Sequence, residues 1–539
     1  MRFLIFVFTF CLIQTQFAQT PVRPKLVVGI VVDQMRYDYL YRFNSKYGKD
    51  GFNRLLNDGA VCENTHIPYI PTYTAPGHTC VYTGSVPAMH GIVGNDWFEK
   101  NLGRNIYCTS DTTYQTVGGI GKVGQQSPKN LWVTTVTDEL RLAQNFKNKT
   151  IAVAIKDRSS ILPGGHSANA AYWLDGKSGH WISSTYYQNT LPTWVKDFNN
   201  KKLYEQYLKE PWSTKLDIRE YDESDADDKW YERSFSNEQN PVFPHKINEM
   251  TAKGYDIIKA SPWGNTYTAE MAKAALVGEQ LGKSNYTDFL AISFSSTDYI
   301  GHQFGPNSIE IQDAYLRLDT EIASLLNAFD AQVGKGNYVV FLTADHAAAH
   351  ARGFMDEHHF PTEVFYHDSL RKALNSELAT RFGKEYAVAE FINMQLYFNE
   401  TLSSTDVSKK ASIQAFIKQW FLKNDMVSKV INLETLNLET LPSGERVLLE
   451  NGYHPKRSGD MQVVFKSAIL EEFPKGTTHG TGYNYDTHIP LLFYGWRINK
   501  KKIISPTYMT DIAPTIATLL QIQEPSGSVG KAIKAVVKD

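Results

Sequence analysis

Cysteine is scarce in this sequence. Only four cysteines occur among 539 residues, and no two of them have the CxxC spacing of a metal-binding pair. A metal site built on cysteine is therefore not expected. Cys62, Cys80 and Cys108 lie beyond the N-terminal segment, so an oxidising compartment would allow one disulfide and one buried thiol, with the pairing left open.

The sequence also lacks an excess of charge of either sign. Its 55 Lys and Arg residues nearly balance its 57 Asp and Glu residues, which gives a formal net charge of −2 at pH 7. Proteins that hold a polyphosphate backbone carry a basic excess, because phosphate contacts supply much of their affinity. We therefore expect no nucleic-acid partner.

Long hydrophobic runs are missing as well, so we expect no stable insertion into a membrane. At the N-terminus, Arg2 is followed by a short apolar run at 3–13 and then by polar residues that end at Ala18. This order is typical of a secretory signal at 1–18, cleaved near Ala18, and predicts a periplasmic or secreted protein. A membrane anchor is the alternative, but a spanning helix needs about 20 apolar residues.

Five short, almost wholly apolar segments are typical of strands that are buried on both faces of a parallel sheet. These segments are 25–32, 150–155, 289–294, 338–343 and 489–494. Helical patterns alternate with them, at 52–56, 136–143, 269–281, 309–329 and 511–520. Such alternation predicts an α/β protein with a mostly parallel sheet covered by helices.

Two segments interrupt this alternation, and we interpret them as insertions. The first, at about 159–262, is rich in Trp and Tyr and is expected to form a lid over one end of the sheet. Its acidic run at 222–228, DESDADD, is expected to be a solvated loop, and cation binding is the less favoured alternative. The second insertion, at about 360–471, is irregular and more helical in pattern.

Titratable side chains follow four of the predicted strands, at the edge where open parallel sheets place their active sites. Taken singly, an Asp at a strand end is commonly a helix cap, and an Asp and a His four residues apart commonly form an ordinary hydrogen-bonded pair. Their coincidence predicts instead a site for zinc or a similar divalent ion. The residues that follow the strands are Asp33, Lys156, Arg158, Asp298, His302, Asp345 and His346.

Thr74, in the segment PTYTAPGHTCVYTG, is a candidate nucleophile. Pro71 and Pro76 predict a sharp turn with a helix beginning after Pro76, which would place the hydroxyl beside unpaired backbone N–H groups. The alternative is that Thr74 is only the helix N-cap, since a Thr hydroxyl is a weak nucleophile without a base or metal. His78 is expected to be structural, because no third residue is evident that would orient it.

The chemistry-bearing residues stand in a set of motifs that runs from about residue 25 to 520. The motifs are VVDQMRYDYL, PTYTAPGHTCVYTGSVPAMHGIVGNDWF, IKDRS, STDYIGHQFGP, TADHAAAH and THGTGYNYDTHIPLLFYG. Together they resemble the alkaline phosphatase superfamily and, within it, the secreted bacterial alkaline phosphatases of the PafA type, which use a threonine nucleophile. The resemblance implies a three-layer αβα sandwich, with one catalytic domain at 19–539 that carries the two insertions.

The resemblance also implies two zinc ions and assigns their ligands. The ligands of the ion that activates Thr74 are matched by Asp33, Asp345 and His346, and the Thr74 hydroxyl would donate one further oxygen to this ion. The ligands of the ion that stabilises the leaving-group oxygen are matched by Asp298, His302 and His479. The residue pattern alone does not select His479, because His488 in the same segment is an equal candidate.

Three further residues match the phosphate-binding group of the family's monoesterases: Asn95, Lys156 and Arg158. The residues themselves support this for Lys156 and Arg158, since two positions on an extended segment project to the same side and can hold a dianionic phosphoryl group. Otherwise they would be ordinary surface cations, and Asn95 would be a turn residue.

The sequence thus predicts a secreted, monomeric alkaline phosphatase that hydrolyses small-molecule phosphate monoesters by in-line transfer through a phosphothreonine. A sulfatase would need C/S-x-P-x-R, but residues 74–78 read TAPGH, with no arginine. A nucleotide pyrophosphatase/phosphodiesterase-like diesterase is expected to lack the pair Lys156 and Arg158. A catalytically inactive, metal-bearing binding protein would have lost a ligand or the nucleophile, yet every position is occupied.

Overall fold

A large central sheet forms the middle of the molecule. The computed structural model describes residues 22–537, so the predicted signal at 1–18 lies outside the described residues. In the sheet's central part, each strand runs parallel to its neighbours, and every residue of these strands is buried, as their continuous apolar sequences predict. In spatial order, these strands are β10 (Tyr338–Thr343), β1 (Leu26–Val32), β9 (Asp288–Phe294), β6 (Thr150–Ala154) and β7 (Ala170–Asp175).

The two sides of the sheet are not parallel. Beyond β10, strand β17 (His488–Gly495) runs antiparallel to β10, and β2 (Ala60–His66) runs antiparallel to β17. The apolar run at 489–494 therefore forms a strand, but not a parallel one, because burial on both faces does not fix a strand's direction. The remaining strands at the edges are β18 (Lys501–Ile503), β19 (Thr507–Tyr508), β8 (His180–Ser184) and β5 (Thr116–Val117).

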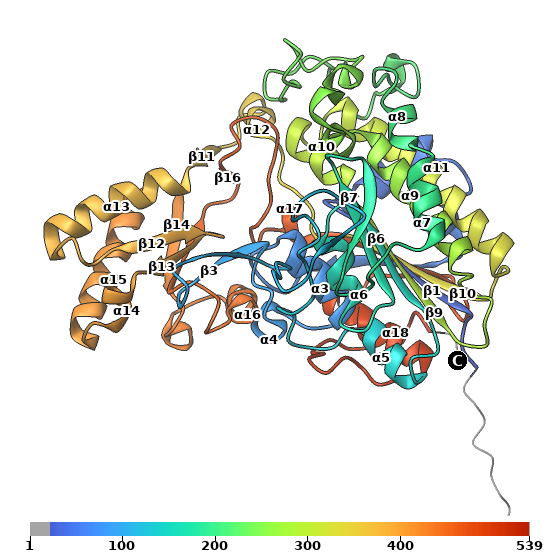
Figure 1. The fold of residues 1–539 in the computed structure, drawn as a ribbon. Coiled ribbons are helices and arrows are strands. Elements are labelled where there is room, and N and C mark those ends of the chain that lie inside the picture. The colour runs from blue at the N-terminus through green and yellow to red at the C-terminus, as the bar shows by residue number, and fades with distance from the viewer. Residues whose placement is uncertain (1–21, 538–539) are drawn as a thin grey trace, which may run out of the picture.

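Helices cover both faces of the sheet (Figure 1), which confirms the predicted three-layer αβα arrangement. One layer contains α2 (Phe52–Asp58), α7 (Thr193–Asn200), α8 (Leu203–Tyr207), α9 (Pro262–Gly278), α10 (Ser296–Phe304) and α11 (Ile309–Gln332). The other contains α3 (Thr74–Thr83), α5 (Val136–Ala143), α6 (Arg158–Gly164) and α18 (Ile512–Leu520). Among residues 22–537, no helix has the length and apolar character required to cross a bilayer.

The segment expected to be an insertion at about 159–262 is in part a piece of the sheet. Strands β7 and β8 lie within it, and β7 pairs in parallel with β6. The aromatic residues that suggested a lid, such as Trp173 and Trp181, are buried side chains of these strands. Aromatic residues favour strands, so their density marks two strands of the sheet that the sequence analysis missed.

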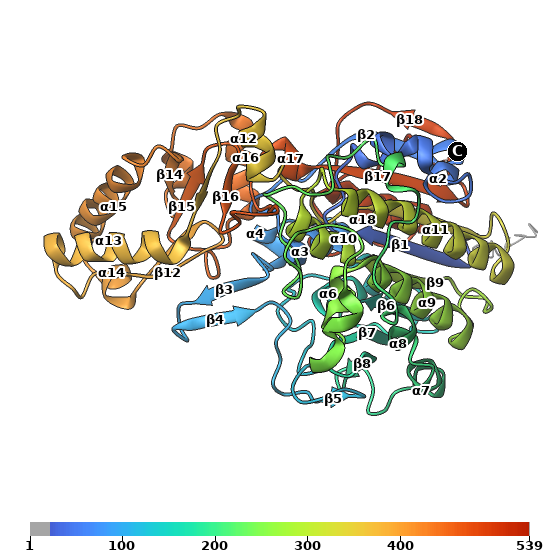
Figure 2. The same cartoon turned by 90° about the horizontal axis from the view of Figure 1, so that it is seen from above.

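Residues 363–471 form a small unit of their own beside the main body (Figure 2). An antiparallel sheet with the strand order β12-β13-β15-β14 packs against helices and encloses a separate hydrophobic core, so this part is less irregular than the sequence suggested. Its strands and helices are β11 (Glu363–Phe365), α13 (His367–Phe382), β12 (Val388–Ile392), β13 (Gln395–Phe398), α14 (Glu400–Ser404), α15 (Val407–Leu422), β14 (Val427–Asn432), α16 (Ser443–Gly452), β15 (Met461–Phe465) and β16 (Ile469–Glu471).

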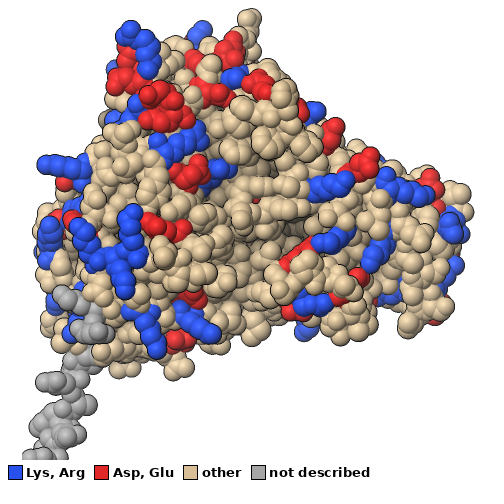
Figure 3. Space-filling view, turned by 180° about the vertical axis from the view of Figure 1, so that it is seen from behind, with Lys and Arg blue, Asp and Glu red and all other residues tan. Residues whose placement is uncertain are grey.

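The cysteines and the surface charges can be compared with what the composition predicted. Cys62, Cys80 and Cys108 are all buried free thiols, so the disulfide that three cysteines would allow is not formed among the described residues. On the face shown in Figure 3, Lys and Arg side chains are interspersed with Asp and Glu, in keeping with the near-zero net charge.

Because β1 packs closely against its neighbours, we expect a larger side chain at Gly29 to destabilise the fold. A methyl group added at Gly29, in the middle of β1, would lie 2.4 Å from Tyr82 Oη and 2.5 Å from Phe341 Cζ. We expect Gly29→Ala to lower the free energy of unfolding by about 1–3 kcal/mol, because such overpacking forces side chains out of position. Urea denaturation measures this, with Gly444→Ala as control, since an added methyl there meets nothing within 4 Å. Equal stability of the two variants would contradict the packing described here.

Candidate active site

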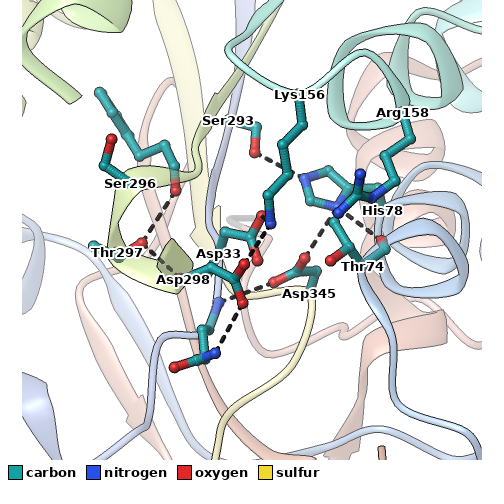
Figure 4. Close-up of polar contacts among 12 residues, drawn as sticks. Asp33, Thr74, His78, Lys156, Arg158, Ser293, Ser296, Thr297, Asp298 and Asp345 are labelled. Atoms are coloured by element: carbon teal, nitrogen blue, oxygen red, sulfur yellow. Dashed lines mark hydrogen bonds and ion pairs between the residues drawn. The ribbon is translucent and has the colours of Figure 1, made fainter. Parts of the chain in front are cut away.

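The side chains predicted to form the site meet at the carboxyl edge of the parallel strands (Figure 4). Asp33 directly follows β1, and Asp345 lies two residues beyond the end of β10. Asp298 lies in the first turn of α10, which begins after β9, and Lys156 lies between β6 and α6. Parallel strands thus bring together residues that are as far as 312 positions apart in the chain.

Asp33, Asp345 and His346 form the first potential ligand group. Their ligand atoms all lie within 4.8 Å of one another, and His346 Nε2 is 3.5 Å from Asp33 Oδ1 and 3.5 Å from Asp345 Oδ2. Both of these oxygens are buried and have no hydrogen-bond partner among residues 22–537. His346 Nδ1 lies 3.1 Å from the carbonyl oxygen of Ala347, which orients the ring toward the carboxylates. This group therefore offers converging ligand atoms that could bind a metal ion.

Asp298, His302 and His479 form the second group. Asp298 Oδ1 lies 3.1 Å from His302 Nε2 and 3.7 Å from His479 Nε2. The Nδ1 atom of each imidazole contacts a backbone carbonyl oxygen, at 2.8 Å for His302 and 2.7 Å for His479. The ring of His479 also stacks on His346 with 3.5 Å between centroids, and the ligand atoms of Asp298, His346 and His479 likewise lie within 4.8 Å of one another. The two groups are thus adjacent.

The electrostatics of the site prepare these residues for a cation. Burial lowers the pKa of His346. Burial also lowers the pKa of His479 well below its usual range, and the neighbouring imidazoles of His346 and His302 add to this effect. Burial by itself would raise the pKa of the Asp298 carboxyl, but the neighbouring His302 and Lys156 hold that pKa well below its usual value. Burial and the neighbouring Asp345 raise the pKa of Asp33, which marks a carboxylate in need of more positive charge. Neutral imidazoles beside carboxylates are the donor set that zinc and similar ions bind.

Lys156 connects the two groups. Its Nζ atom lies 2.7 Å from Asp33 Oδ2 and 2.6 Å from Asp298 Oδ2, and the residue is only 4% exposed. The segment that carries it is not extended as predicted, because β6 ends at Ala154 and Arg158 already begins α6. The side chains of Lys156 and Arg158 still point into the same space (Figure 4), where Arg158 Nη1 is 3.2 Å from the hydroxyl of Tyr107.

Thr74 lies beside the first group rather than capping a helix. Helix α3 begins at Thr74 itself, not after Pro76, because a proline is tolerated in the first turn, where no N–H partner is needed. The N-cap position is held by Tyr73, and Thr74 Oγ1 lies 3.5 Å from His346 Nε2. Asn95 is close to this turn, since its Oδ1 accepts a 2.9 Å hydrogen bond from the N–H of Ala75.

Two polar residues at the site were missed or undervalued by the sequence analysis. Gln34 donates from its backbone N–H to Asp345 Oδ1 and from Nε2 to Asp298 Oδ1, at 3.2 and 2.8 Å. His78 contacts the carbonyl oxygen of Thr74 at 2.9 Å, and its Nδ1 lies 3.2 Å from Asp345 Oδ2. Adjacency to Asp33 was the only available signal for Gln34. Asp345, which lies close to His78, by contrast follows a distant strand end.

Comparison with known proteins reveals close relatives. A family model described as type I phosphodiesterase / nucleotide pyrophosphatase matches residues 27–466. Alkaline phosphatase PafA of Elizabethkingia meningoseptica is 48% identical over 96% of this chain and 95% of its own length. Alkaline phosphatase PhoV of Synechococcus elongatus is 47% identical over 97% and 94%. A Myroides odoratus protein named calcium-transporting ATPase is 50% identical over 96% and 95%.

The likeness extends to three dimensions. The crystal structure of wild-type alkaline phosphatase PafA superimposes with a TM-score of 0.93 and 47% identity, and the match covers 96% of this chain and 100% of that one. Fold and sequence therefore agree over nearly the whole chain.

Proposed function

This chain belongs to the type I phosphodiesterase / nucleotide pyrophosphatase family, within the alkaline phosphatase superfamily, and we propose that it is an alkaline phosphatase that hydrolyses small-molecule phosphate monoesters. The observation that carries the proposal is the placement of Thr74. Its hydroxyl lies beside two adjacent groups of buried carboxylates and imidazoles at the edge where an α/β sheet presents its active site.

We propose that the two groups hold two zinc ions. Asp33, Asp345 and His346 would bind one ion, and the other would be bound by Asp298, His302 and His479. The fit rests on the unpartnered oxygens of Asp33 and Asp345 and on His346 Nε2, which lies 3.5 Å from each of them. When bound, such a pair of ions lowers the pKa of the attacking hydroxyl and neutralises charge on the leaving oxygen.

Thr74 performs the nucleophilic step in this proposal. Its Oγ1 forms a bond to phosphorus as the bond from phosphorus to the ester oxygen breaks, and the alcohol leaves with a proton. Water then hydrolyses the phosphothreonine, which releases phosphate and restores the hydroxyl. The N-terminal end of α3 lies beside the phosphoryl oxygens in this proposal, where the helix dipole favours negative charge. The hydrogen bond from Ala75 to Asn95 keeps this turn in place.

Lys156, Arg158 and Asn95 bind the non-bridging oxygens of the phosphoryl group in this proposal. Lys156 must exchange its carboxylate partners for a phosphoryl oxygen, a change that its long side chain permits. The Arg158 guanidinium, whose Nε has no partner among the described residues, retains donors for a second oxygen. Two cations at one buried site suit a dianion, because a monoester carries one more negative oxygen than a diester.

The second candidate function is a nucleotide diesterase, which the description of the family model favours. The pair Lys156 and Arg158 argues against it, since a diester has less charge for these side chains to bind. A catalytically inactive binding protein is a poorer fit, because the nucleophile and all six proposed ligands are present.

We further propose that the protein is exported and monomeric. The support for export is the sequence at 1–18, with its short apolar run and the small residue Ala18 near the cleavage point. The region 19–539 would then act as one catalytic domain with insertions at about 159–262 and 360–471, and the first of these would also contribute β7 and β8 to the central sheet.

Metal removal tests the proposed cofactor. Exhaustive treatment with a chelator should abolish hydrolysis of an aryl phosphate, and zinc should restore it better than magnesium. Three Asp/His ligands per ion are fewer and softer than the water-rich octahedron that magnesium prefers. Turnover and metal content are measured on the same samples. Full activity in a sample shown to be free of metal would contradict the assignment.

Replacement of the nucleophile tests the role of Thr74. Thr74→Ala should remove most turnover and leave folding and zinc content near the wild type, because the ligand groups do not need the hydroxyl. Thr74→Ser should retain part of the activity, since its hydroxyl occupies the same place. Thr83→Ala, at the far end of the same helix, is the control and should be active. Near-normal rates for Thr74→Ala would mean that another group attacks phosphorus.

The phosphate-binding pair decides between monoesterase and diesterase. Each charge-assisted contact contributes about 1.5–3 kcal/mol, or about tenfold to a hundredfold in rate. Replacing both Lys156 and Arg158 by Ala should therefore lower kcat/KM for an aryl phosphate monoester much more than for the matched diester. Asn95→Ala should act in the same direction with a smaller effect, because its amide is neutral.

Lys149→Ala is the control for this comparison, since Lys149 pairs with Glu279 away from the site. A sulfate ester, assayed in parallel, is expected to react slowly in every variant. If kcat/KM falls by the same factor for the monoester and the diester, Lys156 and Arg158 serve positioning or folding, and the monoesterase assignment is wrong.

A further inference from the structure

A cavity of about 360 Å³ adjoins the phosphate-binding pair of the active site. Lys156 and Arg158, which point into the same space in Figure 4, both line it. Tyr299 also lines it and directly follows the proposed metal ligand Asp298 in α10. Pockets that bind small molecules have volumes of about 300–1,000 Å³. The cavity is therefore large enough for the alcohol part of a small phosphate ester, and it borders the side from which that alcohol would leave.

Another wall of the cavity comes from the first of the two insertions. Lys177 lies in the turn between β7 and β8, and Lys259 lies in the 3₁₀ helix η4 (Asp256–Ala260). The backbone N–H of Tyr255 donates to the carbonyl oxygen of Gly176 at 2.6 Å, which joins this turn to the start of η4. Helix η4 also packs against α10, which carries part of the active site. The fold thus places two further lysines on the same cavity as the phosphate-binding pair.

The carboxylates that line the cavity have partners of their own. Asp157 accepts hydrogen bonds from the Tyr107 hydroxyl and from a backbone N–H. Asp175 is 2% exposed and accepts from two backbone N–H groups and a serine hydroxyl. Asp256 Oδ1 lies 2.6 Å from Lys259 Nζ, but the Asp256 side chain is 69% exposed. An ion pair with so exposed a partner contributes little, so the Lys259 ammonium can exchange it for another anion.

We propose that this cavity is a subsite for a second anionic group on the alcohol part of the substrate, an inference that rests on the proposed phosphatase function. Lys156 and Arg158 would bind the phosphoryl group, and Lys259 would contact a carboxylate or a second phosphate at the other end of the substrate. Its side chain is 21% exposed, so the contact would form partly out of water, where a charge-assisted hydrogen bond is strongest. Lys177 is exposed and would support it from the solvent side. Lys259 is then a residue that determines specificity.

Aromatic side chains suit the cavity to an organic group between the two anions. Trp173 is 2% exposed, and its Nε1 donates to the carbonyl oxygen of Val123 at 3.1 Å, which fixes the ring. The ring of Tyr299 lies with its centroid 5.1 Å from Lys156 Nζ. Such rings offer apolar surface to the carbon atoms of a substrate. The preferred substrates are therefore phosphate monoesters of an organic alcohol that carries a second acid group.

Matched aryl phosphates test the subsite. Phenyl phosphates with a carboxylate in the meta or para position are compared with the corresponding carboxamides, and a benzenediol bisphosphate presents phosphate as the second anion. In the zinc-loaded, full-length protein, Lys259→Gln should lower kcat/KM about three- to tenfold for a carboxylate or the bisphosphate and less than about twofold for the carboxamides. The loss should appear in KM, because the contact is the same in the bound substrate and in the transition state.

Further variants assign the effect to the charge of Lys259. Lys259→Arg keeps the charge and should retain the preference for the second anion. Lys259→Glu reverses the charge and should favour the carboxamides over the carboxylates, relative to the wild type. Lys177→Gln should weaken the preference less than Lys259→Gln does, since Lys177 is exposed. Lys246→Gln removes an exposed cation elsewhere in the same insertion and should behave as the wild type.

Binding of aryl phosphonates separates this inference from the phosphatase assignment, because their phosphorus–carbon bond is not an ester bond. Calorimetry gives Kd for phenylphosphonate and for its meta and para carboxylates. Lys259→Gln should weaken binding of a carboxylated phosphonate about three- to tenfold and leave that of phenylphosphonate nearly unchanged. A protein that hydrolyses none of the esters would contradict the phosphatase assignment, whereas the ratio of these Kd values would still report on the subsite.

Three results would overturn the subsite. The first is a Lys259→Gln variant that hydrolyses the esters and shows the same change in kcat/KM for the carboxylates, the bisphosphate and the carboxamides. The second is a Lys259→Glu variant that discriminates between charged and neutral substrates as the wild type does. The third is a Lys246→Gln variant that loses the preference as strongly as Lys259→Gln, since the effect would then come from the general field of the protein.

Discussion

The need of buried carboxylates for positive charge governs this structure. Asp33, Asp298 and Asp345 stand where three parallel strands end, nearly or completely out of contact with water. Lys156 reaches between two of them and supplies a cation that contacts both groups. Because one lysine cannot satisfy three carboxylates, unpartnered oxygens remain on Asp33 and Asp345. The site is thus arranged to accept more positive charge than the chain itself provides, which is the property that a metal-dependent phosphatase requires.

The sheet makes this concentration of charge possible. Parallel strands end at the same edge, so residues that follow them meet there even though they are distant in sequence. Close packing then fixes the position of Thr74 relative to the carboxylates. A side chain at Gly77, in the first turn of α3, would collide with the backbone of Asp345, 2.3 Å from its carbonyl oxygen. The absence of that side chain lets the helix that begins with Thr74 approach the ligand groups.

How far the sequence predicts this molecule depends on whether the determinants are local. The continuous apolar run of β1 and the Asp after it can be recognised without a structure, because burial on both faces and a strand end leave a local pattern. The direction of β17 could not be predicted, since its pairing partners β10 and β2 come from distant segments. Strand β7 was missed because its aromatic residues were interpreted as part of a lid. His479 needed the resemblance to a family, because spacing alone did not separate it from His488. The role of Gln34 and the contact between His78 and Asp345 appear only when β1, β10 and α3 lie side by side.

The stacking of His346 on His479 links events at the two ligand groups. One imidazole belongs to each group, their ring centroids are 3.5 Å apart, and the ligand atoms of His346 lie within 4.8 Å of carboxylate oxygens of both groups. If both groups bind ions as proposed, an ion in either group would fix a ring against which the other group packs. Occupation of the two positions would then be a coupled equilibrium, in which the first ion pre-organises the place of the second. The protein would then pass from empty to fully loaded over a narrow range of free metal, with few half-loaded molecules in between.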